Sequence, residues 1–177
     1  FYDCKKLKKV KFEFPSSIEK IGNGSFNNCL LLRKIIIPSS VKLIGNLTFE
    51  RCGLLKQIVI PSSVVTIGYG AFMDCINLEK VEFCLPSSLK LLNENVFRDC
   101  KSLVDFTVPP SVTSIESGSF FNCKNLKQIF VPDSVNYIGK YAFKNCISLI
   151  KFSIPPLVTK IEDWTFSDCS SLVKVSI

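Results

Sequence analysis

The amino-acid sequence predicts a β-solenoid of about eight coils of 23 residues, mostly β with very little helix and with a parallel sheet on one face. A Phe-x-x-Cys motif occurs eight times, and its Phe residues are separated by 25, 23, 23, 25, 23, 23 and 23 residues. The Leu three residues after each motif Cys never varies. An interval this regular indicates stacked coils, because each coil must bury its apolar side against the next one.

Each coil begins with a short strand, for which residues 55–60 are the pattern. Leu55, Ile58 and Ile60 are apolar, and the last two alternate with polar positions, so they share one inward face. Pro61 cannot donate to a strand ladder, and the two serines after it favour a turn. Residues 64–67 then predict a second short extended segment on the opposite side. A small residue precedes the motif Phe in all the later coils except at Val96, and it predicts a tight turn or one turn of 3₁₀ helix.

Two coils are longer than the rest by two residues. The sequence FEFP at 12–15 and FCLP at 83–86 stand where other coils have one apolar residue before the Pro. Two extra residues preserve the in-and-out alternation of a strand. We therefore expect two lengthened strands in which Phe14 and Leu85 point inward, while Glu13 and Cys84 point outward.

The repeated unit IPSSVxxIGxxAFxxCxxLxxIxIP resembles the BspA-like leucine-rich repeat proteins over essentially all 177 residues. Asn93, Glu116 and Glu162 depart from it by replacing the Gly that follows the aliphatic residue. The resemblance implies a leucine-rich-repeat solenoid of the α/β-horseshoe type. It also implies an adhesin, displayed at the cell surface or secreted, that binds host or extracellular-matrix proteins; a cytoplasmic location is the alternative.

Composition and charge limit the possible functions. Hydrophobic residues make up 47% of the chain, enough for a continuous core, but apolar runs are only a few residues long, which excludes membrane insertion. We expect residues 1–177 to form a single domain that is a fragment of a longer protein. The net charge of +7 lies entirely in residues 1–60, which hold eleven Lys or Arg against four Asp or Glu. That excess attracts an acidic partner or simply keeps an apolar solenoid soluble.

Eight of the nine cysteines stand in one column, one per coil. Disulfides between coils are disfavoured, since parallel inward side chains give an unsuitable sulfur torsion and the number of cysteines is odd. We expect buried free thiols, with Cys84 alone accessible. The residue before each motif Cys is mostly Asp or Asn, which predicts a backbone turn or, alternatively, a Ca²⁺ ladder.

Catalysis is not expected. The sequence contains no His, which is the commonest general base and metal ligand, and no nucleophile or phosphate-binding motif. We accordingly predict a chain without enzyme activity, cofactor or resident metal, and we expect no nucleic-acid partner.

The outward face of the sheet is the predicted binding surface, because its side chains vary between coils while the core columns stay constant. Neutral surface drift would produce the same variation. We expect a protein ligand or an acidic glycan to bind on the first three coils or, failing that, near Phe130. The candidate residues are Lys9, Lys11, Arg33, Lys34, Ile36, Lys56, Val59 and Phe130.

Two other functions are open. The chain could be a structural spacer or self-assembling array, or an intracellular scaffold. The last strand, residues 172–177, has Lys174 as its only charged residue, and an open strand edge invites pairing with another chain. We therefore expect end-to-end self-association.

Overall fold

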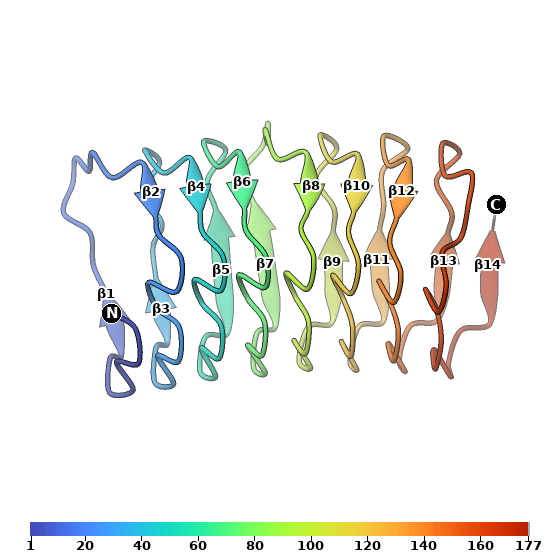
Figure 1. Cartoon of the computed structure of the whole chain (residues 1–177), viewed down its shortest axis with the longest axis horizontal. Coiled ribbons are helices and arrows are strands. Elements are labelled where there is room, and N and C mark those ends of the chain that lie inside the picture. The colour runs from blue at the N-terminus through green and yellow to red at the C-terminus, as the bar shows by residue number, and fades with distance from the viewer. Residues whose placement is uncertain (177) are drawn as a thin grey trace.

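A computed structural model describes residues 1–176 and shows a β-solenoid of parallel sheets. We number the coils from 1, which starts at Phe1, to 8, which starts at Phe166, so that about seven full turns separate the first motif Phe from the last. The coils stand in one row from the N-terminal to the C-terminal end (Figure 1). The described residues form no helix, and none of them therefore belongs to a helix that could cross a membrane.

Coils 1 to 6 each contribute strands to two opposite sides of the solenoid, and coils 7 and 8 contribute one strand each to the first of these sides (Figure 1). The side that we call the sheet face is built from β1 (Lys9–Val10), β3 (Lys34–Ile35), β5 (Gln57–Ile60), β7 (Lys80–Phe83), β9 (Asp105–Thr107), β11 (Gln128–Phe130), β13 (Lys151–Ser153) and β14 (Lys174–Ser176). The other side is built from β2 (Lys20–Ile21), β4 (Leu43–Ile44), β6 (Thr66–Ile67), β8 (Leu91–Leu92), β10 (Ser114–Ile115) and β12 (Tyr137–Ile138).

Paired strands are parallel and in register from one coil to the next. Ile58 lies opposite Val81 on β5 and β7, and Phe106 lies opposite Ile129 on β9 and β11. On the other side the pairing order is β2-β4-β6 and, separately, β8-β10-β12. The interruption falls between coil 3 and coil 4, and coil 4 is one of the two longer coils.

The interior is organised by the motif Phe column. Successive rings stack with centroids 5.3 to 5.6 Å apart from Phe1 to Phe166. Phe49, Phe72, Phe97, Phe120 and Phe143 are completely buried, whereas Phe1, at the end of the described ladder, is 70% exposed. The Leu column is equally buried between Leu32 and Leu149. This confirms the predicted core columns.

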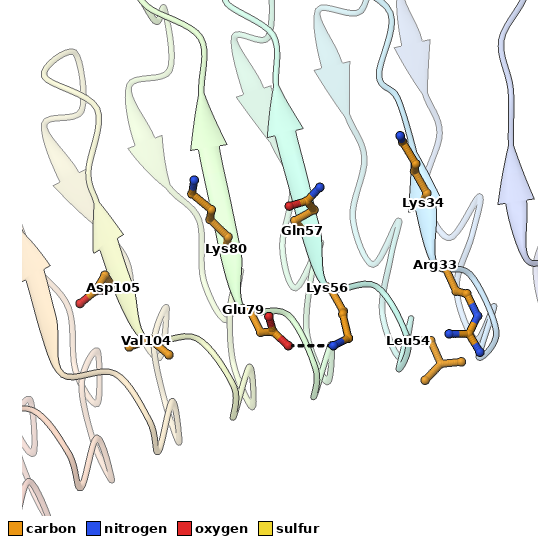
Figure 2. A pocket seen from close by; sticks show the side chains of 9 residues that line it. All are labelled: Arg33, Lys34, Leu54, Lys56, Gln57, Glu79, Lys80, Val104 and Asp105. Atoms are coloured by element: carbon orange, nitrogen blue, oxygen red, sulfur yellow. Dashed lines mark ion pairs between the residues drawn. The ribbon is translucent and has the colours of Figure 1, made fainter.

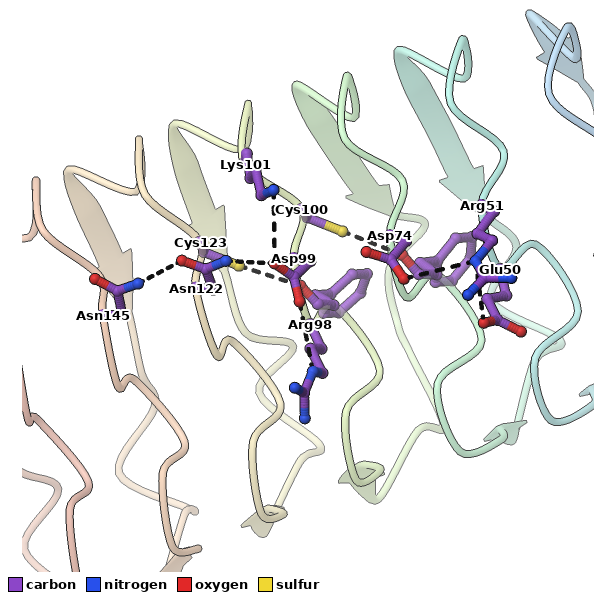
Figure 3. A network of polar contacts seen from close by, with 12 residues as sticks. Glu50, Arg51, Asp74, Arg98, Asp99, Cys100, Lys101, Asn122, Cys123 and Asn145 are labelled. Carbon is purple, nitrogen blue, oxygen red and sulfur yellow. Dashed lines mark hydrogen bonds and ion pairs between the residues drawn. The ribbon is translucent and has the colours of Figure 1, made fainter. Parts of the chain in front are cut away.

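The residue before each motif Cys, which is Asp or Asn except at Arg51, lies in a turn. All eight positions of this column, Asp3 to Asp168, have φ between 57° and 61°, a left-handed conformation that Asp and Asn tolerate better than most residues. Their side chains also join coils: Asn145 donates to the Oδ1 atom of Asn122 at 2.5 Å, and Asn122 donates to Asp99 (Figure 3). Within residues 1–176 no group of acidic or thiol side chains could hold a metal ion.

The column thiols are unpaired, and each one from Cys29 to Cys169 donates to the carbonyl oxygen of the motif Phe in the preceding coil, at 3.0 to 3.3 Å. Burial raises the pKa of the Cys75 and Cys100 thiols well above its usual value, and it raises the pKa of Cys169 to about 11. Cys84 is exposed as predicted, but Cys4 in the first turn is exposed too. The expectation of one accessible thiol was therefore wrong.

The two longer coils do not lengthen their inward strands, which corrects a second expectation. Val10 and Phe12 in coil 1 take the two inward positions, as Val81 and Phe83 do in coil 4. Phe14 and Leu85 are each 65% exposed. A neighbouring coil offers only two inward positions on this side, so a third apolar residue has nothing to pack against and turns outward.

Candidate ligand-binding face

The outward side chains of the sheet face form one continuous surface. Along β5 the exposed Gln57 and Val59 alternate with the buried Ile58 and Ile60, and every longer strand of this face before β14 repeats the alternation. The pleat of a strand separates the two sets, because successive side chains point to opposite sides. The interior therefore fixes the frame, and the outward positions are free to carry different chemistry.

The cations on this surface are not equivalent. Among residues 1–176, Lys9, Lys11, Arg33 and Lys34 make no ion pair. Lys56 instead pairs with Glu79 at 3.2 Å, and Lys80 pairs with Glu82. On the sheet face the unpaired cations are therefore densest on coils 1 and 2, although Lys151 on β13 and Lys174 on β14 also make no ion pair among residues 1–176.

Three predicted residues meet in a shallow hollow where the strands begin. Arg33, Lys34 and Lys56 line it together with Glu79 and Lys80, and its volume is about 620 Å³ (Figure 2). The Lys56–Glu79 ion pair crosses the middle of this hollow (Figure 2). Because anionic and cationic groups share the surface, the hollow suits a polar contact more than a single tightly bound anion.

Ile36 and Val59 lie together further along the strands. They are 55% and 46% exposed and form the floor of a second hollow, of about 530 Å³. Phe14 and Cys84, which belong to the two longer coils, line the same hollow. The sequence had predicted an inward Phe14, so this part of the surface was missed. The signal that could have found it is the fixed number of inward positions per strand.

Phe130 stands apart from the other predicted residues. It is 55% exposed on β11, and its register partner on β9 is Thr107. The structure does not bring it to the basic surface of coils 1 and 2. Lys9 and Lys11, by contrast, share a third hollow of about 160 Å³ with Phe14 and Ile36.

Comparison with known proteins decides the family. The BspA type leucine rich repeat region matches residues 1–104 and 90–177, with six copies of the repeat. The chain belongs to this family. Leucine-rich repeats of this type are protein-interaction modules and are generally non-catalytic. No curated protein sequence matches the chain.

Solved structures place the fold firmly within the family. A leucine-rich repeat protein from Bacteroides ovatus is 30% identical with a TM-score of 0.84, and the match covers 99% of this chain and 50% of that one. The T. pallidum leucine rich repeat protein is 30% identical with a TM-score of 0.76, over 88% of this chain and 72% of that one. The chain thus spans half the length of the Bacteroides protein.

A more distant neighbour shares the fold alone. A leucine rich cell surface protein from Faecalibacterium prausnitzii is 21% identical with a TM-score of 0.51, and the match covers 99% of this chain and 74% of that one. Together these structures confirm the leucine-rich-repeat solenoid that the repeat unit predicts.

Proposed function

We propose that the chain is a non-enzymatic binding module of a cell-surface or secreted protein, which engages a protein or an acidic glycan through the sheet face of coils 1 to 3. One observation carries the proposal. Unpaired cations at Lys9, Lys11 and Lys34 coincide with the exposed aliphatic residues Ile36 and Val59 on a single rigid surface. Charge supplies long-range attraction, and the aliphatic floor supplies area that a ligand can desolvate.

The proposed location of this protein at the cell surface is supported by its similarity in fold to other proteins. One neighbour in fold is a cell surface protein, and another is the pneumococcal vaccine antigen PcpA. A module of this kind would present its sheet face outward on a longer protein, and its interior would remain the same whatever the face binds.

The experiment is retention on a heparin column and on a panel of immobilised extracellular-matrix proteins, at low and at physiological salt. A Lys9→Glu/Lys11→Glu/Lys34→Glu variant should lose retention. The matched control is Lys127→Glu/Lys151→Glu/Lys174→Glu, which makes the same change in charge at exposed positions of the C-terminal coils. Exposed charges are screened over about 8 Å at physiological ionic strength, so retention should fall with salt.

Two results would count against the proposal. If both triple variants behave like the unmodified chain at low salt, the basic surface serves solubility alone. If the control variant loses as much retention as the first, net charge matters and the surface of coils 1 to 3 does not. A structural spacer would bind none of the matrix proteins under any condition.

A further inference from the structure

We propose that the two longer coils bracket a peptide-binding groove, and that its ligand is an extended acidic segment with apolar side chains at alternate positions. This inference rests on the proposed function and names the partner's chemistry. We call the groove, lined by Phe14, Ile36, Val59, Cys84 and Leu85, the bracketed groove.

The two ends of the groove are formed by the extra residues of coils 1 and 4. Coils 1 and 4 each add two residues at the same point, just after the second inward position of the sheet-face strand, and expose Phe14 and Leu85 equally. Coils 2 and 3 lie between them and turn away at once, with Pro38 directly after Ile37 and Pro61 directly after Ile60. The loop of coil 4 is fixed to its neighbour, since the Cys84 amide donates to the carbonyl oxygen of Ile60 at 2.9 Å.

The floor is continuous across the strands. The hollow that holds Phe14 and Cys84 shares Val59 and Cys84 with a further hollow of about 400 Å³, which continues to Leu85 and Pro109. On its other side it shares Phe14 and Ile36 with the small hollow beside Lys9. The groove thus runs from coil 1 to coil 5, at right angles to the strands.

The lysines beside the groove indicate that one side of the ligand is acidic. Lys9, Lys11 and Lys34 border the groove at coils 1 and 2 and make no ion pair among residues 1–176, while the apolar loops border it at the ends of the strands. At coil 4 the groove is lined by Lys80 and Glu82, which pair with each other. A complementary ligand therefore carries carboxylates toward the lysines and apolar side chains toward Phe14, Ile36 and Val59. A second copy of this chain fits poorly, because its own coils 1 to 3 are cationic.

Spacing defines the shape of the ligand. Coils stacked at about 4.8 Å place the two loops about 14 Å apart, which four or five residues of extended chain span at about 3.3 Å each. Side chains of an extended segment alternate between its two sides, so acidic and apolar residues in alternation reach the two borders. A glycan presents hydroxyl groups that the aliphatic side chains of Ile36 and Val59 cannot bond.

The test uses a fluorescein-labelled seven-residue peptide that alternates Glu and Leu, measured by fluorescence anisotropy against the whole chain. Two control peptides replace Leu by Ser or Glu by Lys. We expect saturable binding of the first peptide only. A Phe14→Ser/Leu85→Ser variant should bind at least tenfold more weakly, because it removes the apolar borders. Both residues are exposed, so the fold is retained. Leu157→Ser removes an aliphatic side chain that is 55% exposed in coil 7, outside the groove, and should leave affinity unchanged.

Thiol protection locates the peptide independently. Cys84 lies in the groove and Cys4 lies outside it, and both are exposed. Bound peptide should slow alkylation of Cys84 by iodoacetamide and leave the rate at Cys4 unchanged.

The outcomes separate this inference from the proposed function. If the lysine variant loses heparin and matrix retention while the peptide neither binds nor protects Cys84, the basic surface binds ligands but the groove is not a peptide site. If Phe14→Ser/Leu85→Ser binds the peptide normally, the bracket is wrong. If vesicles of phosphatidylserine protect Cys84 and the peptide does not, the two loops contact membranes and the peptide proposal is overturned.

Discussion

Coils 1 to 4 and coils 5 to 8 bury the same columns but present different sheet faces. The Phe ladder continues through both halves with nearly constant spacing, and the thiols repeat their bonds to the preceding coil in each. On the surface, the first half carries Lys9, Lys11 and Lys34 beside the bracketed groove. The second half also has exposed lysines, at Lys151 and Lys174, but they lie on the face with Asp105, Thr107 and Phe130 and without such a groove among the hollows described above. The comparison teaches that stability is a property of the repeat and that recognition is a property of individual coils.

The largest expected effect tests the shared interior with alkali. Because burial raises the pKa of thiols such as Cys75, Cys100 and Cys146, the folded chain keeps protons on them that the unfolded chain releases above a pH of about 8.5. Stability should be fully present below that pH and fall as pH rises. Each buried thiol contributes a loss of about 1.4 kcal/mol per pH unit, so the whole column outweighs any single substitution.

Urea unfolding between pH 7.5 and 9.5 measures this slope. Cys75→Ala and Cys123→Ala each remove one buried thiol, one from each half. Either variant should make the fall in the free energy of unfolding with pH less steep by about 1.4 kcal/mol per pH unit. Cys84→Ser should not change it, because that side chain is exposed. A flat profile over this range would show that the thiols are accessible in the native state.

The next effect compares single rings of the ladder. Phe49→Ala and Phe120→Ala should each lower the free energy of unfolding by about 3–5 kcal/mol, because a fully buried ring leaves a cavity. Phe120 should lie at the upper end, since it also meets Phe106 edge-on with centroids 4.9 Å apart. Phe1→Ala should cost far less, as that ring is 70% exposed. Equal losses at Phe1 and Phe49 in chemical denaturation would contradict a ladder in which interior rings have two neighbours.

The repeat columns were predictable because they follow from burial between identical neighbours. Leu55, Ile58 and Ile60 lie inward as the alternation requires, and the second extended segment becomes β6. The candidate surface was predictable in part. Lys9, Lys34 and Ile36 were placed correctly by the same alternation, whereas Phe14 and Leu85 were not, because their direction depends on how many inward positions the adjacent coil provides.

The glycine column shows the same dependence on neighbours. The sequence suggests that Gly68 makes a bend, but the structure gives another reason for it. A Cβ atom on Gly68 would lie 2.6 Å from the backbone nitrogen of Asn46 in the preceding coil, and on Gly139 it would lie 2.5 Å from that of Ser117. These glycines allow close approach between coils, which one repeat by itself cannot reveal.

A third prediction follows from that contact. Gly68→Ala and Gly139→Ala should each destabilise the chain by roughly 1–3 kcal/mol, because the methyl group forces backbone to move. Gly22 occupies the same column in coil 1, the first of the described coils, and the nearest atom to its added Cβ would be the Ser25 hydroxyl at 3.5 Å. Gly22→Ala is therefore the matched control and should be close to neutral in thermal unfolding. A large loss of stability in Gly22→Ala would mean that these glycines are needed for their backbone conformation and not for close approach between coils.

The smallest effect concerns the two ends of the solenoid. In residues 1–176, β14 pairs with β13 alone, so one side of its backbone is open, and Lys174 is the only charged residue of the strand. The edge at β1 is instead surrounded by Lys5, Lys6, Lys8 and Lys11. Residue 177, which was included in the predicted edge, lies outside the described residues. Open edges pair with other strands unless charge prevents it, so the β14 end should associate more readily than the β1 end.

Sedimentation velocity across a wide concentration range should show weak, concentration-dependent association of the 177-residue chain. Val173→Lys should reduce it, because Val173 is 77% exposed beside β14 and the new charge repels the cationic β1 end of another copy. Val65→Lys adds the same charge at an exposed site away from either end and should have less effect. Since the repulsion between exposed charges is screened by salt, the difference between the two variants should narrow as ionic strength rises. A strictly monomeric profile at every concentration would show that the side chains of β14 already block pairing.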